Sequence, residues 1–180
     1  MVFSVFSVQT ISAVDLAGYS NNYPRLLGAQ AALGKTLKSI AIKHELASFS
    51  FGDAGIAAYQ SEMIALDNIG LGSAYVARKG VDFEIINKYS PDFVIFHSFP
   101  SGIRLGIYNQ QIVYDWSIEN NLVFVCDVYK TPSGTLKVYS KNKYPELVEL
   151  CVASKELNDM WDKDYFRKYG LIPPWEFWHE

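Results

Sequence analysis

Phe93-Val94-Ile95-Phe96 is an uninterrupted apolar run that leads into His97. A run without polar alternation is typical of a strand at the centre of a sheet that is covered on both faces. Ser90-Pro91 precedes it, and proline disfavours helix in the residue before it, so a preceding helix is expected to end there. The stretch predicts an α/β domain organised around a buried strand over 93–97.

Two further strands are predicted upstream of this run. The segment 46–51 has the composition of a strand and ends at Gly52-Asp53-Ala54-Gly55, whereas 63–67 is a second apolar run that stops at a glycine-containing loop. We expect 46–51, 63–67 and 93–97 to be neighbours in one sheet, because each is apolar and short helices or tight loops connect them.

Helices are predicted around these strands. Over 25–44 the apolar residues recur at three- and four-residue steps and the lysines fall largely on the other side, which indicates an amphipathic helix. Ser73 is placed to cap a short helix that Gly80 would close. Further helices are predicted over 82–89, 110–120 and from Tyr144 onward.

A β-hairpin is predicted near the end of the sheet. Strands over 122–129 and 135–140 flank 130–134, in which Pro132 and Gly134 favour a tight turn. The predicted fold class is therefore α/β: a layered, mainly parallel sheet with flanking helices and an antiparallel hairpin at one edge. The expected organisation is an N-terminal segment, an α/β domain and a helical, aromatic-rich C-terminal appendage, over 1–22, 23–143 and 144–180.

Composition excludes several classes of protein. The 180 residues contain 16 Lys and Arg against 19 Asp and Glu, and 49% of them are hydrophobic. A chain with no basic block is not expected to bind nucleic acid, because such binding depends on dense Lys and Arg contacts to phosphates. The apolar start over 1–8 is interrupted by serines and is too short for a membrane span, which needs about 20 apolar residues.

The two cysteines, Cys126 and Cys151, leave two readings open. Free cysteines are usually buried as small hydrophobic side chains, and this is the favoured expectation. A disulfide is the alternative if the compartment is oxidising. Because no CxxC pair or Cys/His cluster is present, no metal site is expected.

The turn after the first strand resembles an esterase turn without its nucleophile. In those families a strand leads into Gly-Asp-Ser, whereas this chain has Gly52-Asp53-Ala54, and alanine has no nucleophilic atom. We therefore expect no hydrolase activity on acyl esters and assign no catalytic residue.

Polar residues at the predicted strand ends are candidates for ligand binding. Ligands of open α/β sheets bind beside the carboxyl ends of strands, where Asp53 and Asp67 are expected to converge. We expect an open, polar pocket there, with Asp67 more exposed than Asp53. The alternative is that both carboxylates accept hydrogen bonds from loop amides. The ligand-binding candidates are Asp53, Asp67, Asn68, Arg78 and His97.

The order of these segments resembles the soluble C-terminal domain of polytopic membrane glycosyltransferases that use polyprenyl-phosphate sugars, in the mannosyl- and arabinosyltransferase superfamily. The family's GD-x-G-x-x-x-Y turn is similar to 52–59, and its hydrophobic-D-x-x-GL strand is similar to 63–71. A helix like 75–78 and a PD-hydrophobic strand like 91–95 follow. The resemblance spans roughly 23–140, and it departs from the family where Gly72-Ser73 replaces the end of GLTD or GLVD.

The resemblance implies a function. The chain would be an extracytoplasmic domain that assists acceptor or sugar binding and is not catalytic alone, because the superfamily builds its catalytic site from loops between membrane spans. Its partners would be the membrane-embedded part of the same polypeptide and a saccharide or glycan acceptor, with no cofactor. Two alternatives remain: a free-standing small-molecule-binding α/β domain, and an interaction module that docks through its aromatic tail.

Overall fold

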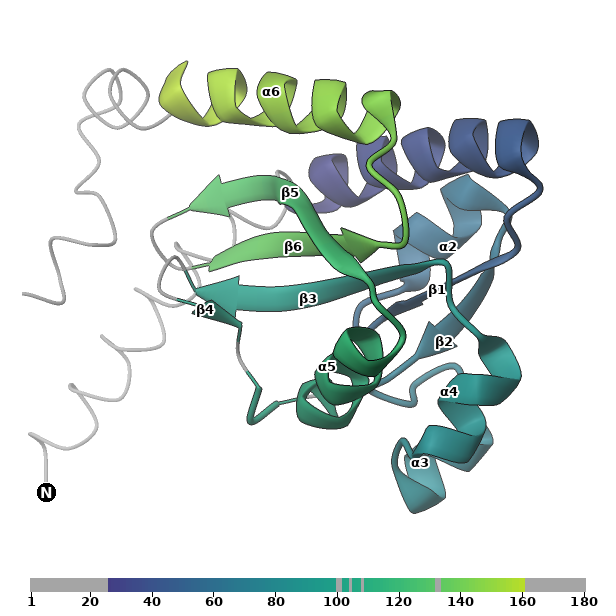
Figure 1. Cartoon of the computed structure of the whole chain (residues 1–180). Helices are drawn as coiled ribbons and strands as arrows, with labels where there is room; N and C mark the ends of the chain where they lie inside the picture. Colours follow the sequence, from purple (N-terminus) through teal and green to yellow (C-terminus); the bar gives the residue numbers. More distant parts are fainter. Residues whose placement is uncertain (1–25, 100–101, 104, 108, 132–133, 161–180) are drawn as a thin grey trace, which may run out of the picture.

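The computed structural model describes residues 26–99, 102–103, 105–107, 109–131 and 134–160. The predicted segment 1–22 and the part of the aromatic tail beyond residue 160 lie outside the described residues. Within them the chain is an α/β fold in which a mixed sheet is flanked by helices (Figure 1).

Among the described residues the sheet has six strands in the order β2-β1-β3-β6-β5, and β4 pairs with β3 off this path. The strands are β1 (Ser48–Phe51), β2 (Ile64–Asp67), β3 (Phe93–Phe99), β4 (Gly102–Ile103), β5 (Val123–Thr131) and β6 (Gly134–Ser140). β1 lies between β2 and β3 and runs parallel to both. The prediction that 46–51, 63–67 and 93–97 are sheet neighbours is therefore confirmed.

The remaining pairs are antiparallel. β6 pairs with β3 on one side and with β5 on the other. The hairpin predicted over 122–140 is thus present, and β5 is an outer strand of the sheet. The predicted fold class, a parallel core with an antiparallel hairpin at one edge, is confirmed.

Helices cover both faces of the sheet (Figure 1). They are a helix over 26–44, α2 (Gly55–Ser61), α3 (Ala74–Lys79), α4 (Phe83–Tyr89), α5 (Gln110–Glu119) and α6 (Pro145–Met160). The 26–44 helix, α2 and α6 pack on one face, and α3, α4 and α5 pack on the other.

Side-chain alternation along β1 and β3 divides the core into two layers. Phe51 and Ile95 face the 26–44 helix, whereas Val94 and Phe96 face α4 and α5. The run from Phe93 to Phe96 is fully buried, as expected for a strand covered on both faces.

Local sequence signals determine several helix ends. The Ser73 hydroxyl accepts a hydrogen bond from the Val76 amide at the start of α3, and Gly80 ends this helix with φ +76°. Both predicted caps are therefore confirmed. Asp82 caps α4 in the same way, because its carboxylate accepts from the Ile85 amide at 2.8 Å.

The first part of the predicted C-terminal appendage belongs to the same core as the sheet. Tyr144 and Leu147, at the start of α6, are buried among residues of β3, β6 and the 26–44 helix.

A disulfide joins Cys126 in β5 to Cys151 in α6. The favoured expectation of two free thiols is therefore wrong, and the alternative of a disulfide holds. The physical reason is tertiary: α6 packs against β5 and brings the two Cα atoms to 6.1 Å, within the range that a disulfide spans.

Candidate functional site

The carboxyl ends of the parallel strands bring three of the predicted site residues to one edge of the sheet. Asp67 is the last residue of β2 and stands opposite Phe51, the last residue of β1. Asp53 follows β1 by two residues, and His97 lies two residues beyond Ile95, which also stands opposite Phe51. The parallel register therefore places these residues at the same end of neighbouring strands.

The Asp67 carboxylate accepts hydrogen bonds from the loop that follows it. Its Oδ1 accepts hydrogen bonds from the amides of Ile69 and Gly70, both at 3.0 Å, and its Oδ2 accepts from the Gly72 amide at 2.6 Å. Three backbone donors satisfy most of what a carboxylate can accept. For Asp67 the structure therefore favours the alternative in which the carboxylate caps loop amides over an open ligand site.

The loop that Asp67 holds packs tightly against α3. Gly70 has φ +95°, and a Cβ at this position would lie 2.6 Å from the Ala77 amide nitrogen. Glycine is required here for both reasons, since other residues rarely adopt this backbone conformation and none would fit. Asp67 and Gly70 together therefore determine how the chain turns from β2 into α3.

Asp53 is hydrogen-bonded to the 26–44 helix. Its Oδ2 accepts a hydrogen bond from the Gln30 side-chain amide at 2.7 Å, and Gln30 is buried in the 26–44 helix. Asp53 and Asp67 are both half-buried, so burial does not rank them in the predicted order. Ala54, which follows Asp53, is buried and precedes α2, and it offers no nucleophile.

His97 is held at its ring and at its backbone. Its ring stacks on Phe51, with ring centroids 5.1 Å apart. Its backbone N–H donates to the Gln110 side-chain oxygen at 2.6 Å, and its carbonyl accepts from the Gln110 side-chain nitrogen at 2.9 Å. β3 continues past the end of β1, so the backbone of His97 has no strand beside it on that side. The Gln110 side-chain amide supplies the donor and the acceptor that a neighbouring strand would give.

Sequence reasoning missed Gln110. It is the first residue of α5 and is fully buried, and a polar residue at the start of a predicted helix carries no signal of this role. Asn68 is also buried, and its backbone carbonyl accepts a hydrogen bond from the Asn109 side-chain nitrogen at 2.7 Å. Arg78 is exposed on α3 and forms no ion pair with the residues that the structure describes.

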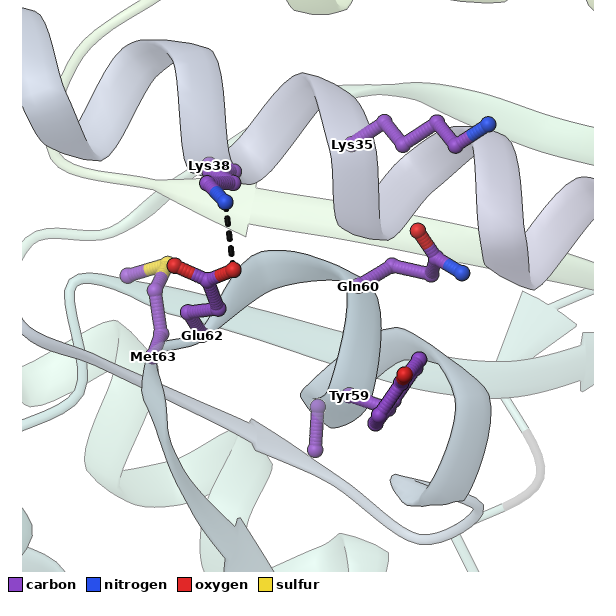
Figure 2. A pocket seen from close by; sticks show the side chains of 7 residues that line it. Lys35, Lys38, Tyr59, Gln60, Glu62 and Met63 are labelled. Atoms are coloured by element: carbon purple, nitrogen blue, oxygen red, sulfur yellow. Dashed lines mark hydrogen bonds and ion pairs between the residues drawn. The ribbon is translucent and has the colours of Figure 1, made fainter.

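A solvent-open hollow of about 810 Å³ lies elsewhere, between the 26–44 helix and α2 (Figure 2). It is lined by Lys35, Lys38, Ala58, Tyr59, Gln60, Glu62 and Met63. Tyr59 ends the segment 52–59 and is not among the predicted site residues. The hollow forms only where the two helices pack together, so the sequence of either helix alone does not predict it.

Shifts in pKa occur at groups outside the strand ends and outside the hollow. The Ile85 amide and the Tyr75 hydroxyl hold the pKa of Asp82 below its ordinary value, and the bond to Asp82 raises the pKa of Tyr75. Burial raises the pKa of Tyr139 in β6. These groups belong to a helix cap and to the core.

Within the described ranges, no cluster of three or more His, Cys, Asp or Glu side chains could hold a metal ion. Among the same residues, no helix combines the length and the apolar character needed to cross a membrane. No family model, curated protein or solved structure matches this chain.

Proposed function

We propose that this chain is the extracytoplasmic soluble domain of a membrane glycosyltransferase, where it assists acceptor or sugar binding and is not catalytic alone. The observation that carries the proposal is structural. The strands β1, β2 and β3 are adjacent and parallel. The segments 63–71 and 91–95 that resemble the family's motifs contain β2 and the start of β3, and 52–59 directly follows β1. In the motif over 63–71, Asp67 holds the loop at the end of its strand.

The aspartate of the PD-hydrophobic segment has such a role. The Asp92 carboxylate accepts hydrogen bonds from the amides of Ala47 and Ser48, at 2.9 and 3.2 Å, and so fastens the start of β1 to the start of β3. A carboxylate at this position joins two strands that are 45 residues apart in sequence. The aspartate of this motif therefore stabilises the pairing of β1 with β3.

The departure from the family pattern at Ser73 also has a structural explanation. The position that is aspartate in GLTD or GLVD is the N-cap of α3 in this chain, and the Ser73 hydroxyl caps the helix. Serine and aspartate are about equally good N-caps, because either oxygen accepts from a free amide of the first turn. The replacement therefore preserves the role that this structure assigns to the position.

The Cys126–Cys151 disulfide supports the extracytoplasmic location. Structural disulfides persist outside the reducing cytoplasm and are rare inside it. A domain on the outer side of a membrane meets this condition.

The test begins with the reading frame upstream of Met1. The proposal expects several apolar segments of about 20 residues there. The enzyme purified from membranes with those segments should transfer sugar from a polyprenyl-phosphate donor, and the 180-residue chain alone should not. A natural start at Met1 with no upstream span would refute the proposal and leave a free-standing small-molecule-binding domain.

A second measurement tests the location. Intact cells are treated with a membrane-impermeant maleimide before and after mild reduction. Labelling of Cys126 and Cys151 only after reduction is the expected result. Labelling that needs cell lysis, or thiols that are free without reduction, would contradict an extracytoplasmic domain.

A further inference from the structure

We propose that the hollow between the 26–44 helix and α2 binds an acidic saccharide, meaning a hexose ring that carries a carboxylate or a phosphate. The inference rests on the proposed function, because that function makes a sugar the ring to be bound. It adds a site that the sequence resemblance does not assign.

Close packing of two helices builds the hollow. A Cβ on Gly34 would lie 2.7 Å from the Ala57 carbonyl oxygen and 2.8 Å from the Gln60 Cβ, so only glycine allows α2 to approach the 26–44 helix this closely. Lys35 and Lys38 lie one and four residues after this contact on the same helix. The contact therefore sets two lysines beside the outer surface of α2.

Tyr59 supplies a stacking surface. Its side chain is 81% exposed, so the ring contributes little to the core. Figure 2 shows Lys35, Gln60 and Tyr59 on one side of the hollow and the Lys38–Glu62 pair on the other. A tyrosine offers a flat apolar face together with a hydroxyl, which suits a sugar with an apolar face and polar edges. The Gln60 amide can both donate to and accept from sugar hydroxyls.

The charges of the hollow favour an anion. Lys38 pairs with Glu62 at 2.5 Å, and the two charges cancel. Lys35 is exposed and forms no ion pair within the part of the chain that the structure describes. The hollow therefore carries one uncompensated positive charge, on the same side as the Tyr59 ring, and Figure 2 shows Gln60 between the two side chains. A neutral sugar would make no ion pair with this charge.

The test is an NMR titration of the full 180-residue chain. The probes are glucuronate, glucose 1-phosphate, methyl glucoside and inorganic phosphate. We expect both acidic sugars to shift the amide signals of Tyr59, Gln60 and Lys35, with the order of affinity of the two distinguishing a carboxylate from a phosphate. Methyl glucoside and phosphate should each bind at least about threefold more weakly, since each lacks one of the two contacts.

Three variants separate binding from folding. Tyr59→Ala should weaken binding about fivefold and Lys35→Gln about threefold. Glu62→Gln removes the partner of Lys38 and should strengthen binding about threefold, a gain that a misfolded protein cannot produce. Leu71→Ala is the matched control, because Leu71 is 90% exposed on the loop after β2 and should leave binding unchanged.

Three results would overturn the inference: no shift with either acidic sugar, shifts that Tyr59→Ala leaves unchanged, or binding of phosphate as tight as binding of glucose 1-phosphate. These failures are distinct from failure of the proposed function. A membrane enzyme that keeps full transfer activity with Tyr59→Ala and Lys35→Gln would refute this site and leave the glycosyltransferase assignment standing. A reading frame without spans would refute the assignment and leave the titration unaffected.

Discussion

Breaking the Cys126–Cys151 disulfide should destabilise this protein by an amount that can be calculated from its place in the chain. The bond joins β5 to α6 across a sequence separation of 25 residues. A cross-link of this span reduces the entropy of the unfolded chain by about 12 cal/mol/K, which corresponds to about 3.5 kcal/mol at 25 °C. In the folded protein both cysteines pack against the core, so Cys→Ala at both positions keeps a small apolar side chain there.

The assay is urea unfolding of the oxidised protein, the reduced protein and the Cys126→Ala/Cys151→Ala double variant. The reduced protein and the double variant should coincide, with a free energy of unfolding about 3.5 kcal/mol below that of the oxidised protein. In a thermal scan the midpoint should fall by about 7–14 °C, since about 2–4 °C corresponds to each kcal/mol for a protein of this size. Either single variant should match the double one.

Two results would refute the reasoning. If the oxidised and reduced proteins unfold at the same urea concentration, the bond does not constrain the unfolded chain as calculated. If mass spectrometry after alkylation without reductant finds two labelled cysteines, the bond is absent, and the support that it gives to an extracytoplasmic location is lost with it.

Three further predictions concern the loops and caps. Gly70→Ala should destabilise the protein by about 2–3 kcal/mol in urea, because the new Cβ meets Ala77 at a positive φ; an unchanged midpoint would contradict this packing. Ser73→Ala should cost about 1 kcal/mol and Ser73→Asp less than about 0.5 kcal/mol, and equal losses would show that the position is not a cap. Because an α4 amide and Tyr75 lower the pKa of Asp82, its stabilising contribution should be present above pH ~4 and be lost as pH falls through the lowered pKa. Asp82→Asn can still cap the helix, so its urea midpoint should depend less on pH between about 2 and 5, and parallel pH profiles would exclude this role.

Most of the fold could be predicted because its signals are local. The apolar run 93–96 indicated a central strand, and the three- and four-residue spacing over 25–44 indicated a helix. Caps such as Ser73 and Gly80 act within one helical turn, so the residues that cause them and the structure they cause are neighbours in the chain. The helix α2 could not be predicted, because the segment 56–60 is too short for its sequence to distinguish helix from strand, and the structure packs it against Gly34.

For the candidate site, the sequence predicted where its residues lie in the sheet but not all of their hydrogen-bond partners. Parallel strands necessarily place Asp53, Asp67 and His97 at one edge, and the register confirms that placement. The loop amides that bond Asp67 were one of the two alternatives that the sequence left open. The partners of Asp53 and His97 could not be predicted, because Gln30 bonds the Asp53 side chain and Gln110 bonds the His97 backbone from separate helices. A residue type shows which bonds are possible, and its neighbours in space decide which are made.

The amino-acid sequence by itself determined the order of helices and strands, the hairpin and the helix caps, since each depends on spacing or on contacts within a few residues. The parallel core could also be predicted, because its apolar runs are joined by short helices or tight loops that favour neighbouring strands. Only the tertiary structure decided that Cys126 meets Cys151, that Asp53 bonds Gln30, and that Lys35 and Tyr59 line one hollow. The physical reason is that these outcomes depend on distances between segments that the chain brings together only when both faces of the sheet are covered.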